Sequence, residues 1–180
     1  SLRDGYAQIY LLNLESSLVE RLTQTDSSQP ARQPAWNPVA SEIVYSIKRF
    51  GAWEIWVLSE AGTGARRLVL SDPNYWDTLP AWSPDGVTIL FSQAKKLSAT
   101  NWLMSHQYSD VKAGLATILN HGNYTNDADY STDGHWLAIE YADGINYDIY
   151  TLDLISDELH RLTIDPAKDF DPAWRPLPVP

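Results

Sequence analysis

The chain has 180 residues, 44% of them hydrophobic and 12% aromatic, and its 13 basic and 23 acidic residues give a formal net charge of −10. This length predicts one domain with enough apolar residues for a core, and the negative charge would repel a nucleic-acid backbone. The absence of cysteine excludes disulfides and thiolate metal sites, and no stretch approaches the roughly 20 apolar residues of a membrane span. We therefore expect neither a nucleic-acid partner nor a membrane span.

Three short phrases recur along the chain in a fixed order. An aliphatic and aromatic phrase starts at Ile9, Ile55, Asn101 and Ile149, which are 46, 46 and 48 residues apart. A second phrase carries an Ala-Trp pair, and its Ala falls at positions 35, 81, 128 and 173, with Tyr130 replacing Trp in the third copy. A third phrase reads Arg-Leu-Thr or Arg-Leu-Val at residues 21–23, 67–69 and 161–163, with 117–119 as its most altered copy. Self-similarity at this spacing predicts one supersecondary unit stacked several times.

Each unit of about 46 residues contains four short β-prone runs, separated by Pro, Asp, Gly and Asn. Besides the three phrases, an apolar run lies at residues 43–46, 89–92 and 137–140. The runs are too short for helices and rich in β-branched and aromatic residues, which predicts four strands per unit. We expect the repeats to cover residues 1–36, 37–82, 83–129 and 130–174, followed by a tail at 175–180.

The connection from the first strand to the second has the chemistry of a tight turn. In the sequence Ser83-Pro84-Asp85-Gly86, Pro presets φ, Asp can bond its own backbone, and Gly supplies a positive φ. Residues 131–134 repeat this pattern with Thr for Pro, whereas residues 37–40 have lost both Asp and Gly. We expect the first turn to be of a different type or more strained.

The large aromatic residue of the second phrase falls at the same place in every unit, at Trp36, Trp82, Tyr130 and Trp174. One aromatic per repeat, each burying roughly 150–250 Å², is what packing between neighbouring units requires. We expect these side chains to hold adjacent units together. The alternative is a stacking platform for sugar or single-stranded nucleic acid.

Together the phrases Arg-Leu-Thr, Pro-Ala-Trp-Ser-Pro-Asp-Gly, Ile-Leu-Phe-Ser and Ile-Tyr-x-Leu resemble the WD40-like (PD40) repeat of the TolB-type β-propellers. The resemblance covers nearly the whole chain, is closest at residues 79–92, and weakens at Asn101, Thr117 and Tyr130. It implies an all-β fold, a β-propeller of about four four-stranded antiparallel blades. It also implies a bacterial protein in the periplasm or outside the cell, although no signal peptide starts this chain.

The strand pattern predicts an incomplete ring. Numbered from the inside, the strands begin with the third and fourth of one blade, continue through three whole blades, and end with one inner strand at residues 173–174. The open blade can be completed within a distorted four-bladed ring or by a second chain, or the arc stays open. Because an open arc exposes apolar faces and unpaired strand edges, we expect a homo-oligomer.

Acidic residues gather just before or at the start of the predicted inner strands, at one end of the central channel. These are Asp77, Asp127, Asp129, Asp169 and Asp171. Converging carboxylates suit a hard cation such as Ca²⁺, which takes six to eight oxygen ligands. Asp in loops, and Asp before Pro, is also ordinary turn chemistry. We expect no cofactor or metal, and Ca²⁺ is the alternative that these carboxylates leave open.

Two further features stand outside the repeat. Tyr75 and Trp76 form an aromatic pair in the loop at residues 71–77, where packing between blades does not demand them, and such a pair is typical of recognition. His121 and Tyr124 lie in the loop that leads to an inner strand and could face the channel mouth. The candidate binding residues are Tyr75, Trp76, Asp77, His121, Tyr124, Asp127, Asp169 and Asp171.

The sequence contains no nucleophile elbow, P-loop, zinc-protease motif or dinucleotide glycine pattern, so we expect no catalysis by this chain. The resemblance implies a non-catalytic scaffold that binds a protein or peptide through its channel mouth and top loops. The alternative is an accessory propeller of an enzyme, either a peptidase gate or a carbohydrate-active propeller. A cluster of His and acidic residues at one channel end would favour the alternative, and His121 is the only candidate for it.

Overall fold

The computed structural model describes residues 1–68, 74–98, 102–110, 116–118, 125–142 and 146–175, and within these the side chains outside 101–126. The described residues form fourteen β-strands and no helix, so none of them belongs to a helix that could cross a membrane. The all-β prediction is confirmed.

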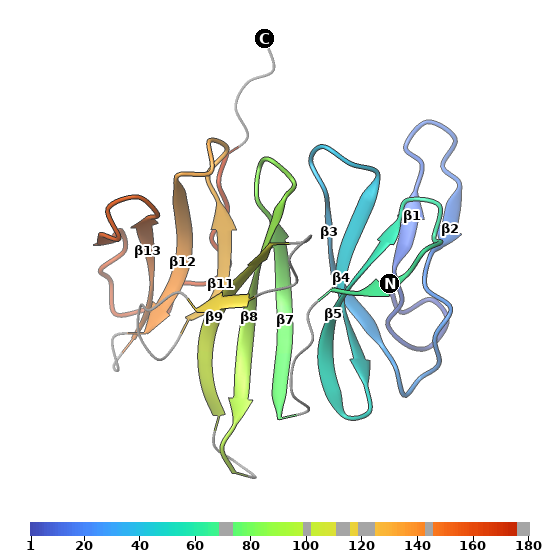
Figure 1. Ribbon diagram of the computed structural model, residues 1–180, viewed down its shortest axis with the longest axis horizontal. Helices are drawn as coiled ribbons and strands as arrows, with labels where there is room; N and C mark the ends of the chain where they lie inside the picture. Colours follow the sequence, from blue (N-terminus) through green and yellow to red (C-terminus); the bar gives the residue numbers. More distant parts are fainter. Residues whose placement is uncertain (69–73, 99–101, 111–115, 119–124, 143–145, 176–180) are drawn as a thin grey trace.

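The strands form three four-stranded antiparallel sheets and one two-stranded sheet, which lie side by side from right to left in Figure 1. The half-blade contains β1 (Tyr10–Leu12) and β2 (Val19–Arg21). Blade 1 contains β3 (Ala31–Trp36), β4 (Glu42–Arg49), β5 (Ala52–Ser59) and β6 (Arg66–Arg67). Blade 2 contains β7 (Tyr75–Trp82), β8 (Thr88–Lys96), β9 (Trp102–Asp110) and β10 (Ala116–Ile118). Blade 3 contains β11 (Thr125–Tyr130), β12 (Trp136–Ala142), β13 (Tyr147–Asp153) and β14 (Leu159–Arg161).

Apolar side chains from facing sheets fill the seams between blades. Because side chains alternate across a strand, odd residues of β4 face the half-blade and even ones face blade 2. The half-blade seam holds Ile9, Leu22 and Ile43, and the seam between blades 2 and 3 holds Leu90, Leu137 and Ile139. The seam between blades 1 and 2 consists of Val44, Ile55, Val57, Leu68, Trp82, Ile89 and Phe91. The core is therefore divided between the seams, as stacked repeats require.

The aromatic residue of the second phrase occupies one register in each blade. Trp36, Trp82 and Tyr130 pair with the second strand at equivalent positions, so the residue equivalent to Ala81 in blade 3 is Asp129. Trp82 is buried in the seam with blade 1, and Tyr130 packs on the seam with blade 2. The prediction is wrong for Trp36, which is 51% exposed, because the half-blade of this chain provides no second strand to cover it.

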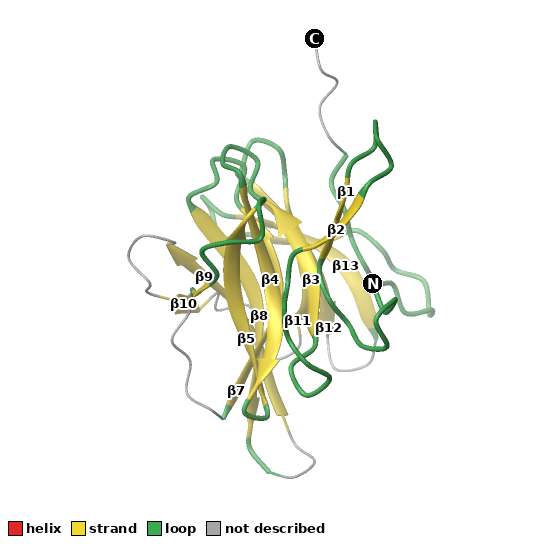
Figure 2. Ribbon diagram, turned by 90° about the vertical axis from the view of Figure 1, so that its right-hand side faces the viewer, coloured by secondary structure: helices red, strands yellow, loops and turns green. Residues whose placement is uncertain are grey.

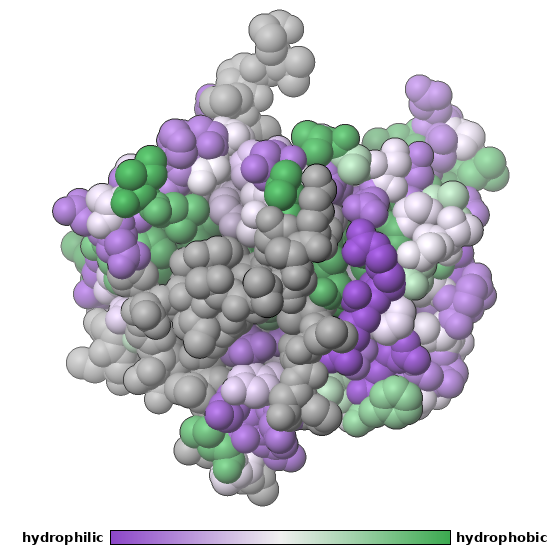
Figure 3. All heavy atoms as spheres, in the orientation of Figure 1, coloured by the Kyte–Doolittle hydropathy of each residue, from purple (hydrophilic) through white to green (hydrophobic). Residues whose placement is uncertain are grey.

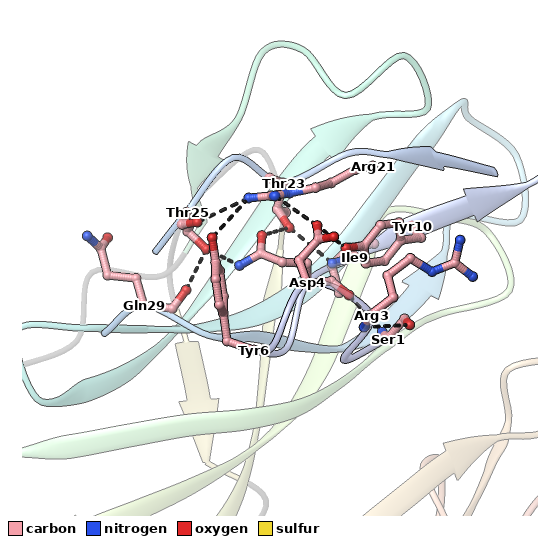
Figure 4. Close-up of polar contacts among 11 residues, drawn as sticks. Ser1, Arg3, Asp4, Tyr6, Ile9, Tyr10, Arg21, Thr23, Thr25 and Gln29 are labelled. Carbon is pink, nitrogen blue, oxygen red and sulfur yellow. Dashed lines mark hydrogen bonds and ion pairs between the residues drawn. The ribbon is translucent and has the colours of Figure 1, made fainter. Parts of the chain in front are cut away.

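The Arg-Leu-Thr phrase joins the outer strand of a sheet to the third strand. In the half-blade, Thr23 Oγ1 accepts the Ile9 N–H at 3.0 Å, and Arg21 Nε donates to the Thr23 carbonyl at 2.7 Å (Figure 4). Blade 3 repeats both bonds. The Ile149 N–H donates to Thr163 Oγ1 at 2.9 Å, and Arg161 Nε donates to the Thr163 carbonyl at 2.8 Å. The phrase recurs because these bonds hold the outer strand in place.

A buried polar residue comes directly before the Ile of the third strand in the half-blade, in blade 1 and in blade 3. In the half-blade, Gln8 Oε1 accepts a hydrogen bond from Thr23 Oγ1 at 2.6 Å. In blade 3, Arg161 Nη2 donates to the fully buried Asp148 at 2.6 Å. In blade 1, Arg67 lies 3.3 Å from Glu54. Removing one partner of such a pair would leave a buried charge uncompensated.

The inner strands β3 and β7 each have a β-bulge two or three residues before the aromatic residue. The pairing of β3 with β4 shifts between Arg32 and Ala35, and that of β7 with β8 between Thr78 and Ala81. Gln33 and Leu79 have φ values of 54° and 53° there, in the left-handed region that residues other than glycine rarely adopt. We refer to this conformation as the inner-strand kink.

The segment 169–175 packs on blade 3 without forming the predicted strand. Its backbone carries the inner-strand kink at Asp171, with φ 55°, although no second strand lies beside it to pair. The Trp174 N–H donates to Asp129 Oδ2 at 2.9 Å, and the Asp169 N–H donates to the Tyr147 carbonyl at 2.9 Å. The prediction that residues 173–174 form an inner strand is therefore wrong, because these residues have no strand conformation.

Candidate binding groove and carboxylate cluster

The ends of the three inner strands form one groove of about 450 Å³. Its walls are the equivalent Ala, Trp or Tyr positions of β3, β7 and β11, together with the turns that follow them. The lining residues are Ala35, Trp36, Pro38, Ala81, Trp82, Pro84, Asp129, Tyr130, Ser131 and Thr132. Since inner strands line the channel of a closed ring of blades, this groove lies on the side of the sheets that would face such a channel. Its aromatic and proline surface offers apolar contact, and Asp129 adds one carboxylate.

The turns that border the groove are fixed by side chains. In blade 2, Ser83 Oγ donates to Asp85 at 2.6 Å and the Val87 N–H donates to the same carboxylate at 3.0 Å. The Ser83 hydroxyl is the main cause that lowers the pKa of Asp85 below its usual value. Blade 3 repeats the arrangement with Ser131 and Asp133. The groove rim is therefore rigid and carries ionised carboxylates at neutral pH.

The first turn differs in type, as expected, but it is not strained. Asn37 Oδ1 accepts the N–H groups of Val39 and Ala40 at 2.9 and 3.0 Å, so the side chain takes the role of the missing Asp. Asn37 also reaches the next blade, because its Nδ2 donates to the Gly86 carbonyl at 3.1 Å. The sequence difference in the first copy thus supplies a contact between two neighbouring turns.

A cluster of carboxylates joins blade 3 to the segment 169–175. One oxygen from each of Asp127, Glu140 and Asp171 lies within 4.8 Å of the others. Asp127 lies in the inner strand β11, Glu140 lies in the second strand β12 and is 1% exposed, and Asp171 is at the inner-strand kink. The Asp171 N–H donates to Glu140 Oε1 at 2.8 Å, whereas Glu140 Oε2 is buried without a hydrogen bond. No ion pair of the described residues connects these three carboxylates to a Lys or Arg.

Burial is the main cause that raises the pKa of Asp127 to about 6; the hydrogen bond from the Ala128 N–H opposes the rise, and the neighbouring carboxylates of Glu140, Asp171 and Asp129 add to it. Asp127 therefore ionises less readily than an ordinary carboxyl group, because it is buried and its charge is repelled by the neighbouring carboxylates. A shared proton or a bound cation relieves this repulsion.

We expect the contribution of Asp127 to the free energy of unfolding to fall as pH rises from about 4 to about 6.5. The unfolded Asp127 titrates near the ordinary value of about 3.9, so the folded state binds more protons in this interval and stability is lost as pH rises through the folded pKa of about 6. The loss is about 1–2 kcal/mol after allowance for partial exposure. Denaturant titrations in EDTA would measure it, and Asp127→Asn should flatten the profile in this interval. Parallel profiles for the two proteins would contradict the assignment.

Tyr75, Trp76 and Asp77 lie in strand β7 and not in a loop, because β7 pairs with β8 from Tyr75 onward. The two rings point to opposite faces of the sheet. Lys95 Nζ lies 5.4 Å from the Tyr75 ring centre, and Lys48 of blade 1 lies 5.8 Å from that of Trp76. Asp77 is fully buried and accepts a hydrogen bond from Gln93 at 2.8 Å. The structure thus gives Trp76 and Asp77 packing contacts, and their role in binding stays a prediction.

The remaining predicted residues divide between the cluster and the rest of the chain. Asp127 and Asp171 are brought together, and Asp169 lies two residues before Asp171 with its Oδ2 buried and unbonded. His121 and Tyr124 lie outside the described residues. Sequence reasoning missed Glu140, although a carboxylate at the end of the apolar run 137–140, where the other units have Ser46 and Ser92, was the available signal. It also missed the groove, which only the convergence of three blades creates.

No protein-family model and no curated protein matches this sequence. Solved structures do match. TolB from Acinetobacter baumannii has a TM-score of 0.67 at 19% identity, over 87% of this chain and 37% of its own. The fold is that of a TolB-type β-propeller. An oligogalacturonate lyase in complex with manganese gives 0.68 at 17% identity, over 86% of this chain and 41% of its own. A structure from a study of two prolyl endopeptidases gives 0.61 at 16% identity, over 87% of this chain and 26% of its own.

The chain spans less than half of each of these three structures. The three names are those of a lyase that acts on a carbohydrate, of peptide-cleaving enzymes and of TolB. The fold that they share with this chain therefore does not show whether this chain takes part in catalysis. The manganese of the lyase belongs to that protein, and what this chain contributes is the carboxylate cluster itself.

Proposed function

We propose that the chain is a non-catalytic propeller module that binds a protein or peptide segment in the groove at the ends of its inner strands. The observation that supports this most is that Trp36, Trp82 and Tyr130, from three different blades, line one groove with a volume of about 450 Å³. Concave, mostly apolar surfaces with a few polar groups are typical of binding sites. Half-exposed tryptophan is also among the side chains that contribute most to protein interfaces.

Trp36 is the side chain that the proposal needs most. It has the register of the buried Trp82, yet 51% of it is exposed, so it can stack on an incoming aromatic, proline or aliphatic group. Pro38 and Pro84 extend the rigid surface beside it. Because the surrounding turns are held by their own side chains, binding would require little ordering of the protein.

A phage-displayed library of random peptides, selected on the intact protein, tests the proposal. We expect selected peptides to lose at least about tenfold in affinity for Trp36→Ala, since a well-placed interface aromatic contributes more than 1 kcal/mol. Phe50→Ala is the matched control, because Phe50 is a 97% exposed aromatic in the β4–β5 turn and lies outside the groove. Equal losses in both variants, or no selectable binders, would contradict the groove as the binding site.

The second candidate is a propeller that accompanies a catalytic domain, which the lyase and endopeptidase relatives in structure favour. In that case the groove would admit an oligosaccharide or a peptide to chemistry performed by residues beyond the described groove. Binding of an oligogalacturonate in place of peptides, abolished by Trp36→Ala, would favour this candidate. From the resemblance we also propose a periplasmic or extracellular location, and from the apolar faces and strand edges of an open arc we propose association with a second copy of the chain.

A further inference from the structure

We propose that Asp127, Glu140 and Asp171 bind one calcium ion, and that this ion fastens the segment 169–175 to blade 3. The proposal is independent of the groove, since none of these three residues lines it.

The buried Glu140 is the first argument. A glutamate that is 1% exposed in the middle of a strand requires partners for both oxygens, and Oε1 has the Asp171 N–H at 2.8 Å. Oε2 has no hydrogen-bond partner, which leaves a buried lone pair unsatisfied beside two further carboxylates. Buried charge of this kind is retained where it is paired with a cation or ligates a metal.

The spacing of the oxygens is the second argument. Ca²⁺ binds oxygen at about 2.3–2.6 Å, so ligands on opposite sides of one ion lie up to about 5 Å apart. The three carboxylate oxygens fall within 4.8 Å of one another, which one Ca²⁺ can span. Mg²⁺ at about 2.0–2.1 Å requires opposite oxygens about 4.2 Å apart and a strict octahedron, so it fits this set less well. Water and bidentate carboxylates would complete the coordination.

The origin of the ligands is the third argument. Asp127 and Glu140 belong to neighbouring strands of blade 3, and Asp171 belongs to a segment that forms no sheet with it. In the described structure that segment is attached by few polar bonds, chiefly those of Asp169, Asp171 and Trp174. An ion bound by both blade 3 and the segment 169–175 would add bonds between them and remove the repulsion among the three carboxylates. Ca²⁺ would thus act as a structural clasp.

Isothermal titration calorimetry and thermal unfolding of the metal-free full chain test the site. We expect one Ca²⁺ per chain and, at about 100-fold excess over Kd, a rise in Tm of about 5 °C or more. Glu140→Gln keeps the shape of the side chain but removes one charge, so it should fold without Ca²⁺ and lose most of the Ca²⁺-induced rise. Glu158→Gln makes the same charge change at an exposed position of blade 3 and should keep the rise.

Limited trypsin digestion distinguishes the clasp from simple ion binding. Lys168 is exposed and lies directly before the segment 169–175. We expect Ca²⁺ to slow cleavage at Lys168 about tenfold in the native chain and in Glu158→Gln. In Glu140→Gln we expect Ca²⁺ to leave the rate of cleavage unchanged. The proposal would be overturned by absence of binding at millimolar Ca²⁺, by binding of Mn²⁺ or Mg²⁺ in preference to Ca²⁺, or by an unchanged Ca²⁺ response in Glu140→Gln.

Discussion

Replacement of Trp82 by Ala should lower the free energy of unfolding by about 3–5 kcal/mol, the usual range for removing a buried large aromatic residue. Trp82 is 7% exposed and packs with Val44, Ile55 and Val57 of blade 1, so its removal opens a cavity between two blades. Neither blade can close this cavity alone, because the strands on both sides are fixed by their own sheets. Urea titration of the purified variant would measure the loss.

Trp36→Ala is the matched control for this prediction. Trp36 has the same place in its inner strand, yet it is 51% exposed, so its removal should change stability by less than about 1 kcal/mol. Equal losses in the two variants would show that Trp36 is covered in solution, for example by a second copy of the chain. A loss below 1 kcal/mol at Trp82 would contradict the packing role of the phrase.

Replacement of Gly86 by Ala should destabilise the protein by about 2–5 kcal/mol, for two separable reasons. Gly86 has a φ of 68°, where an L-residue costs about 1–2 kcal/mol. Its Cβ would also overlap Asn37 Oδ1 and Val39 Cγ2 of blade 1, and overpacking of this kind costs about 1–3 kcal/mol more. The clash would push apart the two turns that Asn37 joins.

Gly134→Ala isolates the first of these effects. Gly134 occupies the same turn position in blade 3 with a φ of 74°, but a Cβ there would lie 3.6 Å from Pro84 Cδ, which is ordinary contact. We expect a loss of about 1–2 kcal/mol for this variant. Equal losses for the two glycines in denaturant titration would rule out the inter-blade clash.

The sequence predicts the fold well because each repeated phrase has a local physical cause. Asp85 and Gly86 encode a turn through their own backbone chemistry, and Thr23 and Arg21 encode a bond to the neighbouring strand. The register of Tyr130 with Leu137 follows as soon as the turn at 131–134 is recognised. Structural features that depend only on the residues of one repeat unit can therefore be predicted from the sequence of that unit.

The site is predicted less well because it depends on contacts between units. Trp36 and Trp82 both lie in a Pro-Ala-Trp phrase, and the number of strands in the preceding sheet makes one exposed and the other buried. Tyr75 and Trp76 were expected in a loop, but pairing with β8 extends the strand to include them. Asp127 and Asp171 were identified by their type and position, whereas Glu140 required knowledge of the face on which a strand residue lies.

The inner-strand kink at Asp171 has a consequence for how the molecule forms. Gln33 and Leu79 hold this unfavourable conformation inside completed sheets, but Asp171 holds it in a segment that is bonded to blade 3, by the Asp171 N–H to Glu140 and by the Trp174 N–H to Asp129. Blade 3 therefore supports this backbone shape although none of the described strands pairs with the segment. We expect each blade to help shape the inner strand that follows it, an order that matches synthesis from the N-terminus.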